Sequence, residues 1–284
     1  MTSLEQRIAG LTGRCPVRLS AMHGGCVSEV YLVEFDQGDR LVAKVDEALT
    51  GQLEIEARML GYLAPHLPVP SVVHSSPGLM LMNHVNGSGS FSAEVQVHAA
   101  ELLAGLHAVE GCAFGFEWDT VIGSLHQPNP ETPSWIAFFG EHRLVYMAEL
   151  AQARGRLPSS LCSRVETLAG VLDRFLSEPD TPSLLHGDIW SGNVLAADGR
   201  VQAFLDPAIY FGHPEVELAF IVMFSTFGTR FFETYAELRG IEDGFFEERA
   251  QVYNLYPNLV HVALFGGSYE HAVEQTLARC GIRS

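Results

Sequence analysis

The segment at residues 184–195 constrains this chain more than any other. It begins with two leucines, continues as His-Gly-Asp, and places Asn193 five residues after Asp188. A second apolar run, at residues 201–205, ends on Asp206. Two carboxylates and one amide therefore end short apolar segments, where strands pass into loops. Loops held on a rigid scaffold often carry the catalytic groups of a protein.

The chemistry of these three side chains indicates phosphoryl transfer. Carboxylate and amide oxygens are hard ligands that suit Mg²⁺. Phosphoryl transfer uses one carboxylate to orient the attacking hydroxyl, and an Asn with an Asp to hold the metal. A plainer interpretation is that His-Gly-Asp is a turn and Asp206 ends a strand, because Gly, Asp and Pro favour turns. The full set, in this order and spacing, favours phosphoryl transfer.

Lysine usage points to a second functional position. The chain has 17 Lys and Arg residues, and Lys44 is the only lysine among them. It lies in a β-rich run at residues 41–45, which follows a predicted hairpin turn at residues 36–40. A lysine is a compact, mobile point charge that suits contact with phosphates. Lys44 is therefore a candidate phosphate-binding residue; an exposed lysine retained by chance is the alternative.

Two nearby features would complete a nucleotide site around this lysine. Gly24 and Gly25 form a turn between predicted strands, which is the layout of a loop that covers phosphates. The chain has no Walker A loop and no Rossmann glycine pattern. Residues 52–63 have apolar residues at helical spacing, and a glutamate on such a helix can hold the lysine on the phosphates. We predict Glu56 as this partner, with a solvated helix face as the alternative.

Composition excludes several classes of protein. The 284 residues are 47% hydrophobic and 18% charged, with a net charge of -17, which is typical of a globular chain that does not bind nucleic acid through Lys and Arg. The apolar run at residues 218–224 is too short to cross a membrane, and no signal pattern opens the chain. Five scattered cysteines without C-x-x-C argue against disulfides and zinc. We expect a cytoplasmic protein with no membrane partner.

The order of the predicted elements indicates an α+β, bilobal, protein-kinase-like fold. A β-rich lobe at residues 1–85 is expected to bind the nucleotide, and a mainly helical lobe at residues 86–284 is expected to carry the catalytic and substrate sites. The Gly/Ser/Asn-rich segment at residues 83–90 is the predicted linker. Helices are expected at residues 2–12, 52–63, 135–154, 161–176 and 217–227, after residue 92 and within 231–279, and residues 111–133 are expected to be irregular.

Four sequence motifs together carry a family resemblance. They are His-Gly-Asp-Ile-Trp-Ser-Gly-Asn at residues 186–193, Leu-Asp-Pro-Ala at 205–208, Tyr-Phe-Gly-His-Pro at 210–214 and Leu-Phe-Gly-Gly-Ser-Tyr at 264–269. They resemble the fructosamine kinase family, which belongs to the wider group of aminoglycoside phosphotransferases and choline kinases. The resemblance covers residues 20–275, nearly the whole chain.

The resemblance implies phosphorylation, by ATP with Mg²⁺, of a hydroxyl on a ketoamine sugar adduct such as a fructosamine or ribulosamine. By position, Asp188 is the base or orienting group for that hydroxyl. Asn193 and Asp206 are implied as Mg²⁺ ligands, and Lys44, held by Glu56, as the phosphate contact.

The remaining roles that the resemblance implies are structural or concern the edges of the site. The nucleotide-binding set also includes Gly24, Gly25, Met82 and His84; the last two lie in a hinge that normally meets adenine through backbone groups. An acidic residue expected before Asn83 is absent, which leaves nucleotide preference open. His186 and Glu217 would brace the catalytic loop. Trp190, Tyr210 and His213 are candidates for the substrate pocket, with ordinary packing as the alternative.

Two other functions compete with ketoamine phosphorylation. One is phosphotransfer to an aminoglycoside or a choline-type amine, and the other is a nucleotide-binding pseudokinase. The complete set of Lys44, Asp188, Asn193 and Asp206 favours an active enzyme acting on a small-molecule or glycated-amine substrate. The sugar size, the amine carrier, the hydroxyl attacked and the choice between monomer and homodimer stay open. Cys26, in the glycine turn, is either a redox-sensitive thiol or a small buried filler.

Overall fold

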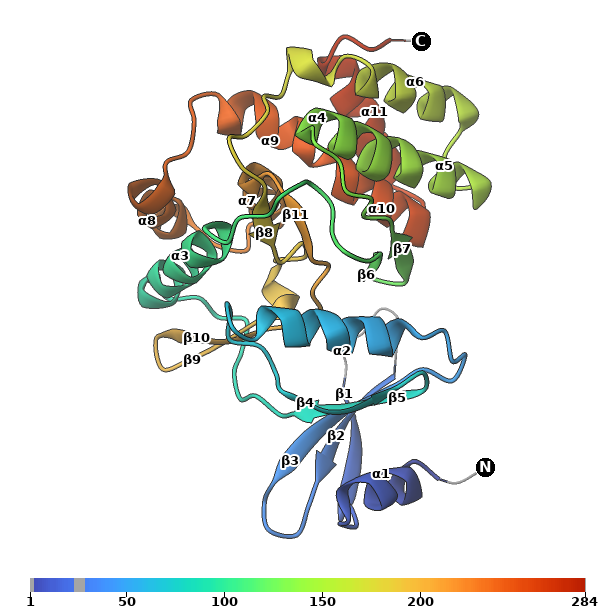
Figure 1. Cartoon of the computed structure of the whole chain (residues 1–284), viewed down its shortest axis with the longest axis vertical. Helices are drawn as coiled ribbons and strands as arrows, with labels where there is room; N and C mark the ends of the chain where they lie inside the picture. Colours follow the sequence, from blue (N-terminus) through green and yellow to red (C-terminus); the bar gives the residue numbers. More distant parts are fainter. Residues whose placement is uncertain (1–2, 23–28, 284) are drawn as a thin grey trace.

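The first lobe is built on a five-stranded antiparallel sheet. The computed structural model describes residues 3–22 and 29–283. The strands are β1 (Arg18–Met22), β2 (Glu29–Glu34), β3 (Arg40–Val45), β4 (Val72–Ser76) and β5 (Leu79–Asn83), in the order β1-β2-β3-β5-β4. Helix α1 (Leu4–Thr12) packs on one face of this sheet and α2 (Gln52–Leu63) packs on the other. Figure 1 shows this lobe below the helical part of the chain.

The alternation of side chains along β3 decides where the lysine points. Successive residues of a strand face opposite sides of the sheet. Ala43 and Val45 are buried in the cluster that includes Ile8 of α1, whereas Val42 is buried against Leu53 of α2. Lys44 has the same parity as Val42, so it faces the α2 side. The strand therefore presents Lys44 to the helix that carries Glu56.

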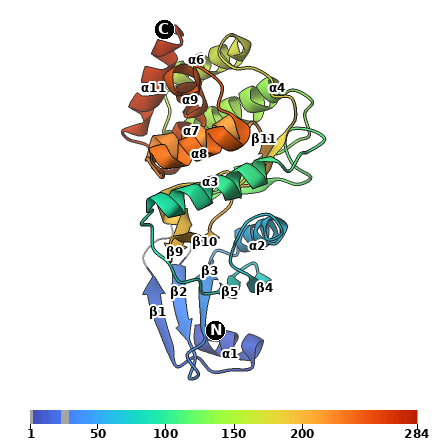
Figure 2. The same cartoon turned by 90° about the vertical axis from the view of Figure 1, so that its left-hand side faces the viewer.

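The second lobe is mainly helical and has one large hydrophobic core. Its helices are α3 (Ala93–His107), α4 (Trp135–Phe139), α5 (Tyr146–Ala153), α6 (Ser159–Ala169), α7 (Pro214–Phe224), α8 (Thr229–Arg239), α9 (Ala250–Tyr253), α10 (Leu255–Phe265) and α11 (Tyr269–Arg279). Helices α3 and α8 lie side by side (Figure 2). The α+β, two-lobed, kinase-like fold predicted from the sequence is confirmed.

Three short antiparallel strand pairs interrupt the helices. They are β6 (Thr120–Ile122) with β7 (Leu125–Gln127), β8 (Ser183–Leu185) with β11 (Tyr210–Gly212), and β9 (Val194–Ala197) with β10 (Arg200–Phe204). The β6–β7 hairpin lies within residues 111–133, so the expectation of a wholly irregular segment was wrong. Each of its strands has three residues, too few to give a clear alternating pattern in the sequence.

Two of the predicted helices are interrupted. The helix expected at residues 135–154 contains a π-helical segment, η1 (Gly140–Val145), and the one expected at 161–176 ends at Ala169 before a 3₁₀ turn, η2 (Leu172–Arg174). Helix α7 begins earlier than expected, because His213 caps it and Pro214 occupies its first turn. The division of the lobes at residue 85 stays a prediction. Within the described residues, no helix is long and apolar enough to span a membrane.

Candidate active site

The catalytic loop leaves β8 through a backbone conformation that only glycine accepts easily. Gly187 has φ +87°, and a Cβ built there would lie 2.2 Å from the carbonyl oxygen of Ala208. Leu184 and Leu185 are fully buried in the core just before this turn. The turn therefore directs the next side chain, Asp188, out of the core and into a cavity between the lobes.

Asp188 is held by an amide that comes from the end of the same loop. Nδ2 of Asn193 donates to Oδ2 of Asp188 at 2.8 Å and to its backbone oxygen at 3.0 Å. Burial, and after it the nearby Asp206 carboxylate, raise the pKa of Asp188 to about 8, against the hydrogen bond from Asn193, which lowers that pKa. A carboxyl with a pKa near neutrality is suited to proton transfer.

Lys44 joins the sheet, α2 and the loop after β10. Its Nζ donates to Oε1 of Glu56 at 2.6 Å and to Oδ1 of Asp206 at 2.5 Å. Burial by itself would lower the pKa of Lys44, but the attraction of the two carboxylates outweighs it and raises that pKa. Lys44 is therefore a cation at neutral pH, and the predicted pairing with Glu56 is present.

A buried glutamate on α7 holds the catalytic loop from beneath. Oε1 of Glu217 accepts from the backbone N of Gly187 at 2.6 Å, and Oε2 accepts from Nε2 of His107 at 2.9 Å. Although burial would raise the pKa of Glu217, the hydrogen bond and charge of His107 lower it. Nδ1 of His186 accepts from the backbone N of Asp188 at 3.3 Å. The bracing contacts expected of Glu217 and His186 are thus present.

The carboxylates, the lysine and the amide all face one cavity of about 330 Å³, which is in the size range of small-molecule sites. Its polar lining includes Lys44, Gln52, Glu56, Asp188, Asn193, Asp206, Glu217 and His261. Its apolar lining includes Val121, Ile122, Trp190, Phe220, Phe224, Tyr256, Val260, Leu264, Phe265 and Tyr269. The cavity therefore has a charged end at the lobe junction and a largely aromatic wall in the helical lobe.

Not every predicted residue reaches this cavity. Trp190 lines it, with 36% of its surface exposed. Tyr210 does not, because β11 pairs with β8 and its ring is buried against the guanidinium of Arg143, 4.0 Å from the ring centre. His213 does not either, because its ring caps α7 and accepts from the backbone N of Glu215 at 3.1 Å. Neither ring lines the cavity, and the substrate roles suggested for Tyr210 and His213 stay predictions.

Met82 and His84, two further residues predicted for the nucleotide site, do not line the cavity. Met82 and His84 are at the end of β5, and their role in adenine binding stays a prediction. Gly24, Gly25 and Cys26 lie outside the described residues.

Several lining residues were missed from the sequence, notably the β6–β7 hairpin and the aromatic side chains of α7 and α10. The C-terminal motif at residues 264–269 was the available signal for part of the aromatic wall.

The donor atoms around the charged end fit Mg²⁺. Both hydrogen-bond donors of Asn193 face Asp188, since Nδ2 makes both bonds, so its Oδ1 is left to accept a cation. Asp206 gives one oxygen to Lys44, and its side chain is 40% exposed. No group of three or more His, Cys, Asp or Glu side chains that could hold a metal occurs in the described part of the chain. Phosphate oxygens and water would complete the shell, as Mg²⁺ prefers.

Comparisons with known proteins agree with this geometry. The family model for fructosamine kinase matches residues 3–283. A protein of Synechocystis sp. assigned as a ketoamine kinase is 36% identical over 98% of this chain and 96% of its own length. The chloroplastic protein-ribulosamine 3-kinase of Arabidopsis thaliana is 30% identical over 89% of this chain and 79% of its own length.

Solved structures show the same relationship in three dimensions. A crystal structure from Thermobifida fusca, assigned as a fructosamine-3-kinase, has 30% identity, a TM-score of 0.87 and full coverage of both chains. The aminoglycoside phosphotransferase APH(4)-Ia shares the fold at 17% identity, with a TM-score of 0.69, 99% coverage of this chain and full coverage of its own. The motifs, the site and these comparisons agree, and the chain belongs to the fructosamine kinase family of phosphotransferases.

Proposed function

We propose that the protein transfers the γ-phosphoryl group of ATP to a sugar hydroxyl of a ketoamine adduct, with Mg²⁺. The observation that carries the proposal is the convergence of Lys44, Asp188, Asn193 and Asp206 on one cavity, in a member of the fructosamine kinase family. These groups come from both lobes and from segments far apart in the sequence. Family relatives named as ketoamine and ribulosamine kinases supply the substrate class.

Each of these residues has its own role in the proposed reaction. Asp188 accepts the hydrogen bond, and then the proton, of the attacking hydroxyl. Lys44 binds phosphate oxygens, which replace part of its contact with Asp206. Asn193 and Asp206 hold Mg²⁺, which when bound neutralises charge on the phosphates. Glu217 keeps Gly187, and with it the catalytic loop, in the conformation that aims Asp188 at the acceptor.

The cavity is less suited to a polycationic aminoglycoside. Its lining has four carboxylates, and each already has a partner inside the protein: Glu56 and Asp206 on Lys44, Asp188 on Asn193, and Glu217 on Gly187 and His107. A polycation needs unpaired carboxylates to replace its hydration. The rest of the lining is mainly aromatic and aliphatic, and Trp190 lies two residues beyond Asp188, where the sugar would bind. These features favour an acceptor with one amine.

Turnover tests the proposal directly. Purified protein with MgATP is expected to phosphorylate ribulose- or fructose-adducted lysine, detected by ³¹P NMR and by ADP release, and Asp188→Ala is expected to abolish the reaction. Turnover with choline or aminoglycosides alone would contradict the ketoamine assignment. Thermal stabilisation by ATP without turnover of any acceptor would favour a pseudokinase. A cytoplasmic location and a choice between monomer and homodimer stay predictions, which fractionation and light scattering would test.

A further inference from the structure

The β6–β7 hairpin connects the two halves of the cavity. Ile122 and Gly123, near its tip, line the cavity. At the turn, the backbone oxygen of Ser124 accepts from Nε2 of Gln52 at 3.1 Å. Gln52 begins α2, the helix that carries Glu56 one turn later. The tip of the hairpin is thus attached to the nucleotide-side helix, while its base belongs to the helical lobe.

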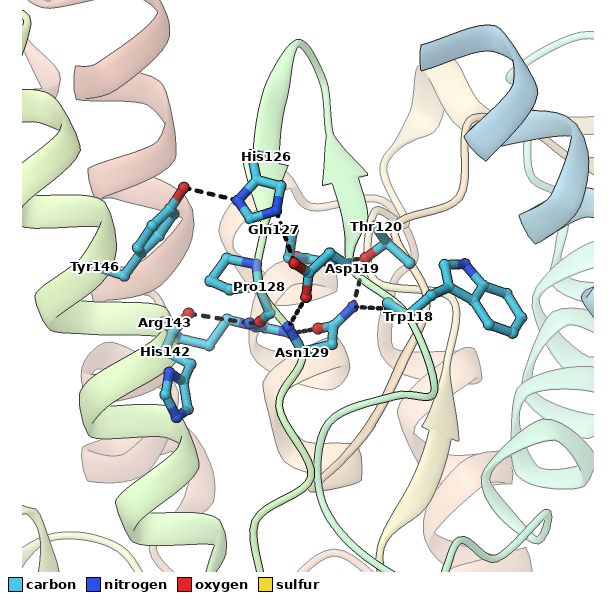
Figure 3. A network of polar contacts seen from close by, with 10 residues as sticks. All are labelled: Trp118, Asp119, Thr120, His126, Gln127, Pro128, Asn129, His142, Arg143 and Tyr146. Carbon is cyan, nitrogen blue, oxygen red and sulfur yellow. Dashed lines mark hydrogen bonds and ion pairs between the residues drawn. The ribbon is translucent and has the colours of Figure 1, made fainter. Parts of the chain in front are cut away.

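The base of the hairpin is fixed by a fully buried arginine. Nη1 of Arg143 donates to the backbone oxygen of Pro128 at 2.7 Å, and Nη2 donates to Oδ1 of Asn129 at 2.6 Å (Figure 3). Asn129 in turn donates through Nδ2 to Oγ1 of Thr120 at 2.8 Å. In the described part of the chain, the contacts of the Arg143 guanidinium are neutral acceptors and the rings of Phe138 and Tyr210, although the residue is 0% exposed.

Burial of the Arg143 guanidinium costs free energy, and its position indicates which part of the structure depends on it. A guanidinium taken from water without a carboxylate loses solvation that neutral acceptors and aromatic rings only partly replace. Departures from an apolar core concentrate where function requires them. Here the buried charge orders the β7 end and, with it, the next buried polar residue, Gln127.

Gln127 reaches from the hairpin into the catalytic centre. It is 1% exposed and every polar atom of its amide is engaged. Nε2 donates to Oγ1 of Thr120 at 2.8 Å and to the backbone oxygen of Ala208 at 3.0 Å, and Oε1 accepts from the hydroxyl of Tyr256 at 2.5 Å. Tyr256 lines the cavity. Figure 3 shows Gln127 beside Thr120 within this network.

Ala208 is the point where the two catalytic loops meet. It follows Asp206 by two residues, and its backbone N donates at 2.8 Å to the oxygen of His186, which precedes Asp188 by two residues. Its carbonyl oxygen packs directly on Gly187. Asp206 itself has φ +51°, an uncommon conformation for a non-glycine residue that its surroundings must maintain. Fixing the Ala208 carbonyl therefore fixes the spacing between Asp188 and Asp206.

We propose that Gln127 is a positioning residue for phosphoryl transfer. Its amide holds the Ala208 peptide, so that the Asp206 loop keeps its place relative to Asp188 and to the β6–β7 hairpin. Gln127 touches neither substrate nor metal and acts through the peptide it binds. The proposal rests on the proposed function, because it assigns Asp206 to Mg²⁺ and Asp188 to the acceptor.

Two substitutions at Gln127 remove the donor and keep the size of the side chain. Gln127→Glu keeps an acceptor for Tyr256 but offers an ionised oxygen to the Ala208 carbonyl, and Gln127→Met offers neither donor nor charge. The matched control is Gln96→Glu. Gln96 also bridges two backbone segments, donating to Phe91 at 3.2 Å and accepting from Gly228 at 2.9 Å, and it lies outside the cavity lining.

Both Gln127 variants are expected to lower kcat about tenfold or more and to raise the half-saturating Mg²⁺ concentration about threefold or more, because small misplacements of reacting groups reduce rate steeply. Gln96→Glu is expected to match the wild type. Calorimetric titration with ATP gives a second readout that needs no acceptor: the gain in affinity from Mg²⁺ is expected to shrink in the Gln127 variants, while affinity in EDTA is unchanged.

The outcomes separate this proposal from the proposed function. Wild-type protein that phosphorylates no ketoamine contradicts the function, yet the calorimetric comparison still tests Gln127. An unchanged Mg²⁺ dependence in both Gln127 variants overturns the positioning role, even with lowered kcat, because a general loss of folded protein would lower rate alone. If Gln127→Glu does not fold, Gln127→Met decides the matter by the same measurements.

Discussion

Asp188→Asn is expected to abolish phosphorylation and at the same time to make the protein more stable. The reason is the raised pKa of Asp188, about 8 against an ordinary value of 3.8, caused chiefly by burial and by the nearby Asp206. A carboxyl whose pKa is higher in the folded state binds more protons there than in the unfolded chain. Stability therefore falls as pH rises from about 4 to about 8.

The size of the effect follows from the shift. One pKa unit corresponds to about 1.4 kcal/mol, so full expression of this shift would remove about 5 kcal/mol between pH 4 and pH 8. Asp188 faces the cavity and keeps some contact with water, which reduces the figure to about 2 kcal/mol. An asparagine at position 188 has no charge to desolvate and can still accept from Nδ2 of Asn193, so the variant avoids this loss.

Urea unfolding without nucleotide, followed by tryptophan fluorescence at about pH 4.5 and about pH 8, measures the difference. The variant is expected to gain on the wild type by about 2 kcal/mol at the higher pH, and to differ little at the lower. Asp180→Asn, at an exposed position, removes the same charge at the surface and serves as control. A stability difference that is independent of pH, or a variant less stable than wild type at about pH 8, would refute the reasoning.

Three other substitutions test separate parts of the structure. His213→Asn keeps an N-cap for α7 but removes a ring whose pKa is lowered to about 4 by burial and by Arg249. Because the unfolded chain binds more protons between about pH 6.5 and pH 4, the wild type should lose about 2 kcal/mol more unfolding free energy than the variant as pH falls through that window. Urea unfolding measures this difference, and equal losses in the two proteins would contradict it. Gly187→Ala should lower the free energy of unfolding by about 3 kcal/mol, because its Cβ meets the Ala208 carbonyl at positive φ; a thermal midpoint within about 2 °C of wild type would argue against that clash. Trp190→Ala should raise KM for the ketoamine about tenfold with KM for ATP unchanged, and equal rises in both would place Trp190 outside the acceptor site.

The charged end of the site was largely predictable because its signals are local. Lys44 is marked by its uniqueness and by its place in a β-rich run after a predicted hairpin turn, and the Asp188-to-Asn193 spacing lies within one loop. Glu56 was chosen from its helix and its contact with Lys44 followed. In each case, a short stretch of sequence determines which way the side chain points.

The features of the fold and site that could not be predicted from the sequence depend on contacts between distant segments. Tyr210 adjoins the catalytic motifs in sequence, but its pairing in β11 with Leu185 of β8 turns the ring into the core. The backbone that follows the β6–β7 hairpin is held at Pro128 by Arg143, which comes from a different element. The strands of the hairpin are too short to show an alternating pattern in the sequence. No local pattern in the sequence predicts a buried arginine beside them.

The solitary lysine has a consequence for the chemical fate of the protein itself. Reducing sugars add to amines that are both accessible and unprotonated. The only ε-amino group of this chain is 8% exposed, lies between two carboxylates, and has a raised pKa that keeps it protonated. Sixteen arginines carry the rest of the basic charge without such a nucleophile. The protein is therefore almost inert, at its lysine side chain, to the reaction that produces ketoamines.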